Sequence, residues 1–255
     1  MKKQLVSLIF IFSFLSLSTQ AATTTEQLCK NYKKKNYFKK LIASSANRLT
    51  FRNKGGLLNG GVCWWHSRFT RNALYLATFN PKKNRPTEKQ KIKIIKNIRK
   101  GNQVVEIPGY DNLQDFSYYN RELIQKELEK WQITDGFINQ QWIVGLWGST
   151  HKNEKKLKKW MDKLYKYVVT NDNIAYQKVQ MRGIDAHAWL VYDMNKTADG
   201  YELEVIDSNS SSTRTIYYSN GDTSIRDHWY GNIIPYTGRK LELKRVKKAI
   251  RKFCK

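Results

Sequence analysis

The sequence predicts an α+β fold in which helices come first and an antiparallel sheet follows. Apolar residues recur at helical spacing up to about residue 170, and polar and apolar residues then alternate in four successive runs separated by turn residues. No Gly-, Ser- or Pro-rich linker interrupts the chain, which holds only four prolines. We therefore expect residues 22–255 to form a single domain with a substantial core.

Residues 1–21 have the form of a secretory signal peptide. Two lysines precede an apolar run from Leu5 to Ser18, and small residues follow at 19 and 21, the positions that a signal peptidase reads. The run is shorter than the ~20 apolar residues of a membrane span, so an uncleaved anchor is the less favoured interpretation. We expect a secreted or periplasmic protein with no membrane span once the signal is removed.

The chain is strongly basic, with 46 Lys and Arg residues against 21 Asp and Glu residues and a formal net charge of +25. Lysines gather in runs at 31–40, 153–160 and 244–255. Such a charge favours an anionic partner, namely a cell-wall or envelope polymer, a lipid surface or nucleic acid. The alternative, which we prefer, is that these lysines only solvate helix faces. No specific nucleic-acid-binding motif accompanies them.

Helical spacing and end signals place the expected helices. The second is an amphipathic helix that begins at Cys63 and ends near Asn80-Pro81, and the third opens with a capping box from Thr87 to Gln90 and closes at Gly101. Residues 103–107 are expected to form a short strand, and the apolar stretch 136–148 is expected to be buried. The helices are expected at 24–48, 63–79, 86–101, 111–131, 153–170 and 239–253.

Four strands are expected at 174–181, 184–193, 201–207 and 213–219. In the second, IDAHAWLVYD, His187 and Trp189 share one face. A hairpin symmetric about Thr197 would pair residue 193 with residue 201 and place His187 directly opposite Asp207, with Cβ atoms ~5 Å apart. A register shift of one residue would put these two side chains on opposite faces.

Three cysteines remain after export: Cys29, Cys63 and Cys254. Because domain termini often lie close together, we expect a disulfide between Cys29 and Cys254, which leaves Cys63 as the free thiol. The cysteine spacing fits no metal site, and we expect neither a metal nor another cofactor. Cys63 follows Gly60-Gly61 at a helix start, where the helix dipole favours a thiolate; the alternative is an inert buried cysteine.

A nucleophilic cysteine needs a base, and His187 is the favoured candidate with Asp207 as the acid that orients it. Other interpretations stay open. His187 alone is equally typical of a core histidine bonded to a nearby acid, and His66 competes as the base because it lies three residues after Cys63 on the same helix. Asp193 and Asn209 are alternatives to Asp207, whereas His151 and His228 are expected in exposed loops.

These motifs resemble the papain-like superfamily of cysteine proteases, including its transglutaminase-like branch. The resemblance lies in GVC with Trp64 directly behind the cysteine, in the strand motif HAW, and in the acid that ends the next strand, and it covers residues 55–210. It implies a papain-like fold with the Cys63 helix packed on a C-terminal antiparallel sheet. It also implies a cleft, for which Trp64, Trp189 and Asn209 are the candidate lining residues.

The sequence departs from the papain pattern at the oxyanion donor. Papain-type enzymes have a glutamine six residues before the cysteine, where this chain has Leu57. Asn59 is the candidate replacement, helped by the backbone N–H of Cys63. Gln140 and Gln141 are the alternatives, if that segment folds back towards the site.

The expected function is that of an exported thiol hydrolase or acyltransferase that cleaves or exchanges amide bonds through a Cys63 thioester. Its substrate would be a peptide or another amide, with an anionic cell-wall or envelope polymer as a further partner. One alternative is a non-catalytic basic envelope protein that binds anionic polymer on the same scaffold. Another is a toxin-like or nucleic-acid-binding secreted protein.

Overall fold

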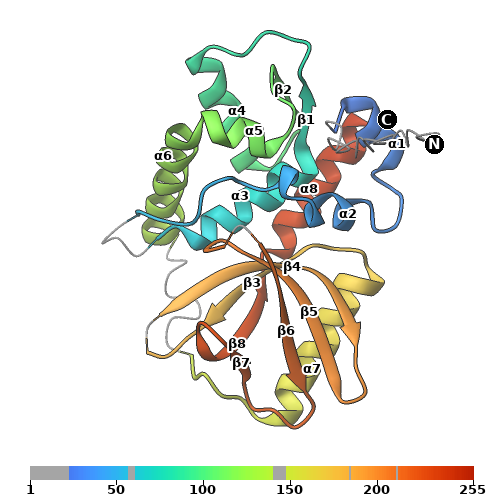
Figure 1. Cartoon of the computed structure of the whole chain (residues 1–255), viewed down its shortest axis with the longest axis vertical. Coiled ribbons are helices and arrows are strands. Elements are labelled where there is room, and N and C mark those ends of the chain that lie inside the picture. Colours follow the sequence, from blue (N-terminus) through green and yellow to red (C-terminus); the bar gives the residue numbers. More distant parts are fainter. Residues whose placement is uncertain (1–22, 57–60, 140–147, 184, 211) are drawn as a thin grey trace, which may run out of the picture.

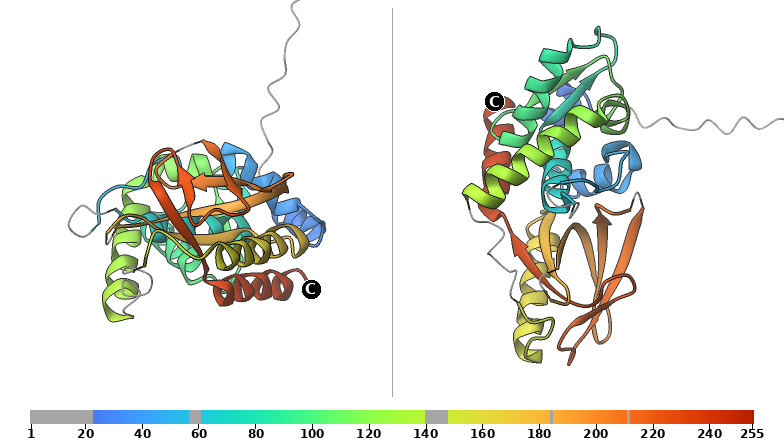
Figure 2. Two further views of the ribbon diagram at one scale, coloured as in Figure 1. Left: turned by 90° about the horizontal axis from the view of Figure 1, so that it is seen from below. Right: turned by 90° about the vertical axis from the view of Figure 1, so that its left-hand side faces the viewer.

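The computed structural model describes residues 23–56, 61–139, 148–183, 185–210 and 212–255. The proposed signal peptide at 1–21 lies outside these residues. The described chain is α+β, as predicted: helices gather in one half of the molecule and an antiparallel sheet forms the other (Figures 1 and 2). No helix within the described ranges is long and apolar enough to cross a membrane.

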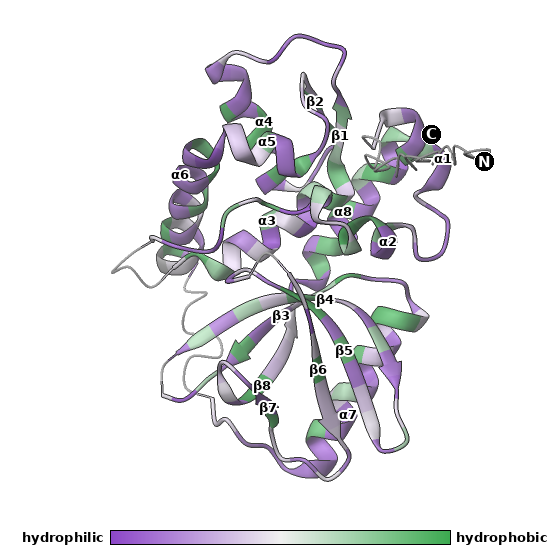
Figure 3. Cartoon of the chain, viewed as in Figure 1, coloured by the Kyte–Doolittle hydropathy of each residue, from purple (hydrophilic) through white to green (hydrophobic). Residues whose placement is uncertain are grey.

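The helical half is built from six helices that precede the sheet in sequence and one that follows it. Its helices are α1 (Thr25–Asn31), α2 (Tyr37–Ala43), α3 (Cys63–Leu76), α4 (Glu88–Lys100), α5 (Leu113–Tyr119), α6 (Arg121–Gln132) and α8 (Lys240–Phe253), with the short helices η1 (Ser45–Asn47) and η3 (Ile133–Ile138). Two strands, β1 (Ala77–Asn80) and β2 (Val105–Pro108), form a parallel pair beside them. The visible side of α6 is largely hydrophilic in Figure 3, because its buried residues, among them Ile124 and Leu128, face the core.

The other half is a six-stranded sheet in the order β6-β5-β4-β3-β8-β7, with antiparallel neighbours in every pair whose register is defined. Helix α7 (Glu154–Tyr165), continued by η4 (Lys166–Thr170), covers one face (Figure 1). The strands are β3 (Ala175–Gln180), β4 (Ala186–Lys196), β5 (Gly200–Asp207), β6 (Thr213–Ser219), β7 (Ile225–Asp227) and β8 (Gly231–Gly238).

Several boundaries differ from the sequence predictions. The helix expected at 24–48 is divided where Asn36 takes a left-handed backbone with φ of 61°. The helix expected at 63–79 ends at Leu76, after which the chain extends into β1. Ile138 is exposed although 136–148 was expected to be buried, and residues 140–147 lie outside the described ranges. Strands β7 and β8 were not predicted.

Helix α3 is central rather than amphipathic, since all of its residues from Cys63 to Leu76 are buried. It packs against β4 of the sheet and against α4, α6 and α8 of the helical half. Polar residues on it are therefore buried as well and need partners from other elements. This position puts the first turn of α3 at the junction between the two halves.

The disulfide between Cys29 and Cys254 is present, as predicted, and Cys63 is the free cysteine. The disulfide joins α1 to the residue that follows α8, and the Cα atoms of the two cysteines are 5.1 Å apart. Helix α8 leaves the sheet and returns through the helical half, so its end reaches α1 (Figure 1). Disulfides of this kind are typical of oxidising compartments.

The hairpin of β4 and β5 pairs in a different register from the one predicted. At the turn Lys196 pairs with Tyr201, three residues out of step with the expected pairing, and Asp207 pairs with Trp189 rather than with His187. A β-bulge lies between Val191 and Asp193 and changes the offset to two residues. Since side chains alternate along a strand, an odd offset would have put His187 and Asp207 on opposite faces. The bulge restores an even offset and keeps them on the same face.

Candidate active site

Three side chains from distant parts of the sequence meet at the junction of the two halves, and we call them the triad: Cys63, His187 and Asp207. Cys63 begins α3, His187 is the second residue of β4, and Asp207 ends β5. His187 Nε2 lies 2.6 Å from Asp207 Oδ1. The Cys63 side chain lies close enough to His187 for its charge and a side-chain hydrogen bond to raise the pKa of His187. Because Nε2 contacts the carboxylate, Nδ1 is the ring nitrogen that remains for the sulfur.

The triad holds a proton on His187. Burial lowers the pKa of His187, but the charge of Cys63, the hydrogen bonds with Asp207 and Cys63 and the charge of Asp207 outweigh it and raise this pKa to about 10. Burial raises the pKa of Asp207, whereas the hydrogen bond and charge of His187 lower it, and the net shift is downwards. An ionised carboxylate therefore faces an imidazolium with only 3 % of the His187 surface exposed.

Asp207 is fixed by four hydrogen-bond partners. Besides His187, the backbone N–H of Asn209 donates to Oδ1 at 2.9 Å, and Arg214 Nη1 and the Tyr230 hydroxyl donate to Oδ2 at 2.7 and 3.0 Å. Sequence reasoning missed Arg214 and Tyr230. Arg214 could have been found, because the short connection between the two expected strands indicates a hairpin, and in it Arg214 pairs with Val205, on the same face as Asp207.

The start of α3 is tied to the end of β5 by Asn53, which the sequence analysis also missed. Asn53 Oδ1 accepts a hydrogen bond from the backbone N–H of Val62, the residue before the helix. Its Nδ2 donates to Asn209 Oδ1 at 3.0 Å, and its backbone N–H donates to the Ser208 carbonyl at 2.6 Å. This bridge fixes the position of Cys63 relative to Asp207. No signal in the sequence marks Asn53, since the contact depends on how the loop at 48–56 folds.

Backbone groups at the helix start supply the other electrostatic feature. Cys63 and Trp64 occupy the first two positions of α3, where backbone N–H groups have no acceptor within the helix. These groups and the helix dipole place positive partial charge beside the sulfur. The proposed oxyanion donor Asn59 lies outside the described residues, as do Leu57 and the alternatives Gln140 and Gln141.

Two rejected alternatives have other roles in the structure. His66, the competing base, places Nε2 2.9 Å from the carbonyl oxygen of Phe51, and burial lowers its pKa to about 4. It is therefore neutral at physiological pH and donates to that carbonyl. Asp193, an alternative acid, forms an ion pair with Lys39 at 2.8 Å. Neither residue is bonded to His187.

The three residues expected to line a cleft are placed differently. Trp64 lines a cleft beside the triad. Trp189 does not, because it is fully buried in the core of the sheet half and donates to Gln177 Oε1 at 3.0 Å. Asn209 bridges Asn53 and the Tyr230 hydroxyl instead. Trp189 was expected to reach the cleft because it shares a strand face with His187, but at Trp189 that face is buried in the core.

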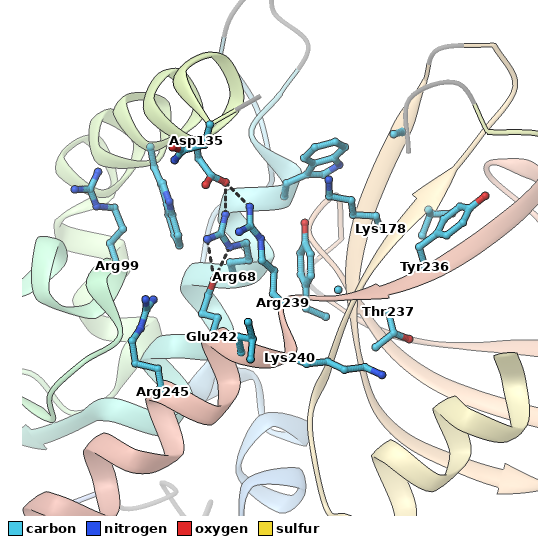
Figure 4. A pocket seen from close by; sticks show the side chains of 18 of the residues that line it. Arg68, Arg99, Asp135, Lys178, Tyr236, Thr237, Arg239, Lys240, Glu242 and Arg245 are labelled. Carbon is cyan, nitrogen blue, oxygen red and sulfur yellow. Dashed lines mark hydrogen bonds and ion pairs between the residues drawn. The ribbon is translucent and has the colours of Figure 1, made fainter. Parts of the chain in front are cut away.

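The cleft has a volume of about 970 Å³ and opens between helices α3, α4, α6 and α8 and the neighbouring strands β3 and β8 (Figure 4). One wall of it is formed by a group of ion pairs that we call the Arg68 cluster: Arg68, Arg71, Asp135, Arg239 and Glu242. Arg68 donates to Asp135 at 2.6 Å and to Glu242 at 2.7 Å. Arg239 reaches Asp135 at 2.8 Å, and Arg71 reaches Glu242 at 3.4 Å. The cluster joins α3 to α8 and to η3.

Within the described part of the chain, no group of three or more His, Cys, Asp or Glu side chains is placed to hold a metal ion. The triad itself offers a cysteine sulfur, an imidazolium and a carboxylate in sequence. Comparisons of the chain with protein-family models, with curated proteins and with solved structures found no match.

Proposed function

We propose that this chain is an exported papain-like thiol hydrolase or acyltransferase that acts on amide bonds. The observation that carries the proposal is the unbroken series of contacts from Cys63 through His187 to Asp207. The packing of α3 on β4 of an antiparallel sheet supports the papain-like arrangement. The Cys29–Cys254 disulfide supports export to an oxidising compartment.

In the proposed first step the Cys63 thiolate attacks the carbonyl carbon of an amide. The carbonyl oxygen becomes an oxyanion next to the backbone N–H groups at the start of α3, with Asn59 as the proposed side-chain donor. The imidazolium of His187 then gives its proton to the leaving nitrogen as the C–N bond breaks. A thioester on Cys63, a free amine and a neutral His187 result.

In the second step an acceptor attacks the thioester. Neutral His187 takes a proton from water or from an amine as the acceptor adds to the carbonyl carbon, and the C–S bond breaks to return the Cys63 thiolate. Water yields a carboxylic acid, and an amine yields a new amide. Asp207 keeps the imidazole in the tautomer whose Nδ1 faces the sulfur, and it stabilises the imidazolium.

Thiol labelling tests the proposal directly, because Cys63 is the free cysteine. We expect iodoacetamide to alkylate the folded protein at pH 6 almost as fast as at pH 8, whereas an ordinary thiol slows about tenfold for each pH unit below ~8.5. The variant H187Q should lose this advantage, and H228Q should keep it, because the His228 side chain is exposed and is not among the hydrogen-bond partners of His187 or Asp207.

Labelling in urea serves as the control for the presence of the thiol, and C63A should take up no label in either condition. If wild type and H187Q label at the same rate at pH 6, the pair is not functional and the proposal fails. The remaining interpretation would then be the non-catalytic basic protein that binds anionic polymer.

A further inference from the structure

The cleft beside Trp64 lies next to the triad, although Cys63, His187 and Asp207 are not among the residues that line it. Trp64 directly follows Cys63, and Ala186 directly precedes His187, and both line the cleft. Val179 of β3 lines it too and is the sheet partner of His187. A molecule that occupies the cleft therefore lies close to the triad.

The lining of the cleft is strongly basic. Two acidic side chains contribute to it, Asp135 and Glu242, and both are already engaged by arginines of the Arg68 cluster. The other charged groups carry positive charge from four directions: α4, β3, the start of α8 and its second turn (Figure 4). The basic lining residues are Arg68, Arg99, Lys100, Lys178, Arg239, Lys240 and Arg245.

Three of these cations, Lys178, Arg68 and Lys240, lie over aromatic rings. Lys178 Nζ lies 3.6 Å from the centre of a Trp64 ring, and the Arg68 guanidinium lies 4.1 Å from that of Trp131. Burial lowers the pKa of Lys178 to about 8, and Arg239 lowers it as well, whereas Asp135 raises it. Burial thus makes the charged form of Lys178 less favourable than it is in water, and an anion beside it would stabilise that form.

Size and chemistry narrow the class of anion. A cleft of about 970 Å³ is at the upper end of the range for small-molecule sites and accommodates several peptide residues. Its walls combine positive charge with the rings of Trp64, Trp131, Tyr176 and Tyr236, which suit an extended chain with apolar as well as charged groups. Amide chemistry at the end of the cleft favours a peptide over other polyanions.

We infer that the cleft binds an acidic peptide segment, rich in Asp or Glu, whose neighbouring amide is presented to Cys63. This inference rests on the proposed function for the role of Cys63, but the binding itself does not. It narrows the substrate class from amides in general to peptides with side-chain carboxylates. Recognition would take place in this cleft and not over the whole basic surface.

Binding is best measured with the full disulfide-bonded protein carrying C63A, so that no turnover occurs. Fluorescence anisotropy would compare a labelled peptide of alternating Glu and Leu with the same peptide in which Gln replaces Glu. We expect the Glu peptide to bind at least about tenfold more tightly at low salt, and the difference to shrink as the salt concentration rises.

Matched double variants separate the cleft from the general charge. Lys100 and Arg245 line the cleft, whereas Lys96 and Lys244 are exposed on the same two helices and do not line it. K100Q with R245Q should weaken binding of the Glu peptide about tenfold, and K96Q with K244Q should change it less than twofold. Both pairs remove the same charge, and circular dichroism would verify that both fold.

The outcomes are distinct. Equal weakening by the two pairs, or equal affinity for the Glu and Gln peptides, would overturn the inference. The inference would also be overturned if polyphosphate or single-stranded DNA displaced the peptide, bound more tightly than it, and depended on Lys100 and Arg245 in the same way. If Cys63 of the wild type labels rapidly at pH 6 but the Glu peptide does not bind preferentially, the proposed function stands and this inference fails. If the Glu peptide binds preferentially but Cys63 does not label rapidly, the inference about the cleft stands and the proposed function fails.

Discussion

The triad and the Arg68 cluster both include residues of the central helix α3 and are largely buried, but their charges differ in kind. In the Arg68 cluster, burial lowers the pKa of Arg68 while Glu242 and Asp135 raise it, and the net effect is upwards. Burial raises the pKa of Glu242 while Arg68 and Arg71 lower it, with a net downward shift. Both shifts favour the charged forms of Arg68 and Glu242. The cluster can fix elements in place but cannot move a proton.

The triad, in contrast, contains one group that can gain and lose a proton, the imidazole of His187. His187 has an ordinary pKa near neutrality, and its raised value depends on the charge of Cys63. Once Cys63 is acylated that charge is gone, so the same imidazole becomes a better proton donor and then a base. The triad and the Arg68 cluster, which share helix α3, can therefore have separate roles: the cluster stabilises the fold and the triad transfers protons. The predictions below test this separation, starting with the largest effect.

The largest effect is expected for D207N. Asparagine keeps the shape and an acceptor oxygen but removes the charge that helps to raise the pKa of His187, so acyl transfer should fall by on the order of 10³–10⁴. For wild type we expect activity to decline as the pH rises through about 10, where His187 loses its proton. In D207N this decline should begin at lower pH.

A pH profile of single-turnover acylation would measure both effects. The matched control is D193N, which removes an acid from the same hairpin that bonds Lys39 rather than His187. An alkaline limit that is the same in D207N and wild type would contradict the role given to Asp207.

The Arg68 cluster should respond in stability instead. In E242Q the guanidinium of Arg71, which is fully buried, loses its ion pair with Glu242, and Arg68 loses one of its two carboxylate partners. Breaking a buried pair in this way costs about 3–5 kcal/mol of unfolding free energy. Urea denaturation would measure the loss, and the alkaline limit near pH 10 should not move in the fraction that stays folded. A shifted limit would show that the two clusters are coupled.

Removal of the disulfide sharpens the comparison further because it changes no charge in either cluster. We expect C29S with C254S to lose about 3–4 kcal/mol of unfolding free energy, since the bond closes a loop of nearly the whole domain. Labelling of Cys63 at pH 6 should be unchanged under native conditions in a protein that is still folded. Slower labelling would mean that α8 and α1 help to hold the triad in place.

The triad also shows how much of the site could be predicted from the sequence. The meeting of His187 and Asp207 was predicted, but through a register that is wrong by two residues, because the bulge between Val191 and Asp193 contains no Gly or Pro to signal it. Strand β8 was missed because Pro235 argues against an interior strand. The alternation of polar and apolar residues is a local pattern. It therefore predicts reliably which face of a strand a side chain lies on, but it predicts poorly the register between two strands.

The burial of α3 could not be predicted for a related reason. Arg68 and Arg71 are typical of an exposed helix face, and only Asp135 and Glu242, far along the chain, make their burial tolerable. The disulfide was predictable because it follows from cysteine number and chain ends. Contacts that depend on loop paths, such as those of Asn53, leave no such trace.

The smallest effect concerns His66, which shares the helix but belongs to neither cluster. Burial lowers its pKa to about 4, so between pH 6.5 and 4 the unfolded chain binds a proton there that the folded chain does not. Unfolding free energy should therefore fall as the pH drops through this window, by up to about 3 kcal/mol. H66Q retains a donor for the Phe51 carbonyl and should remove this part of the acid sensitivity. Urea titrations at pH 7 and pH 4.5 would measure it, and an undiminished difference in H66Q would mean that the acid sensitivity arises elsewhere.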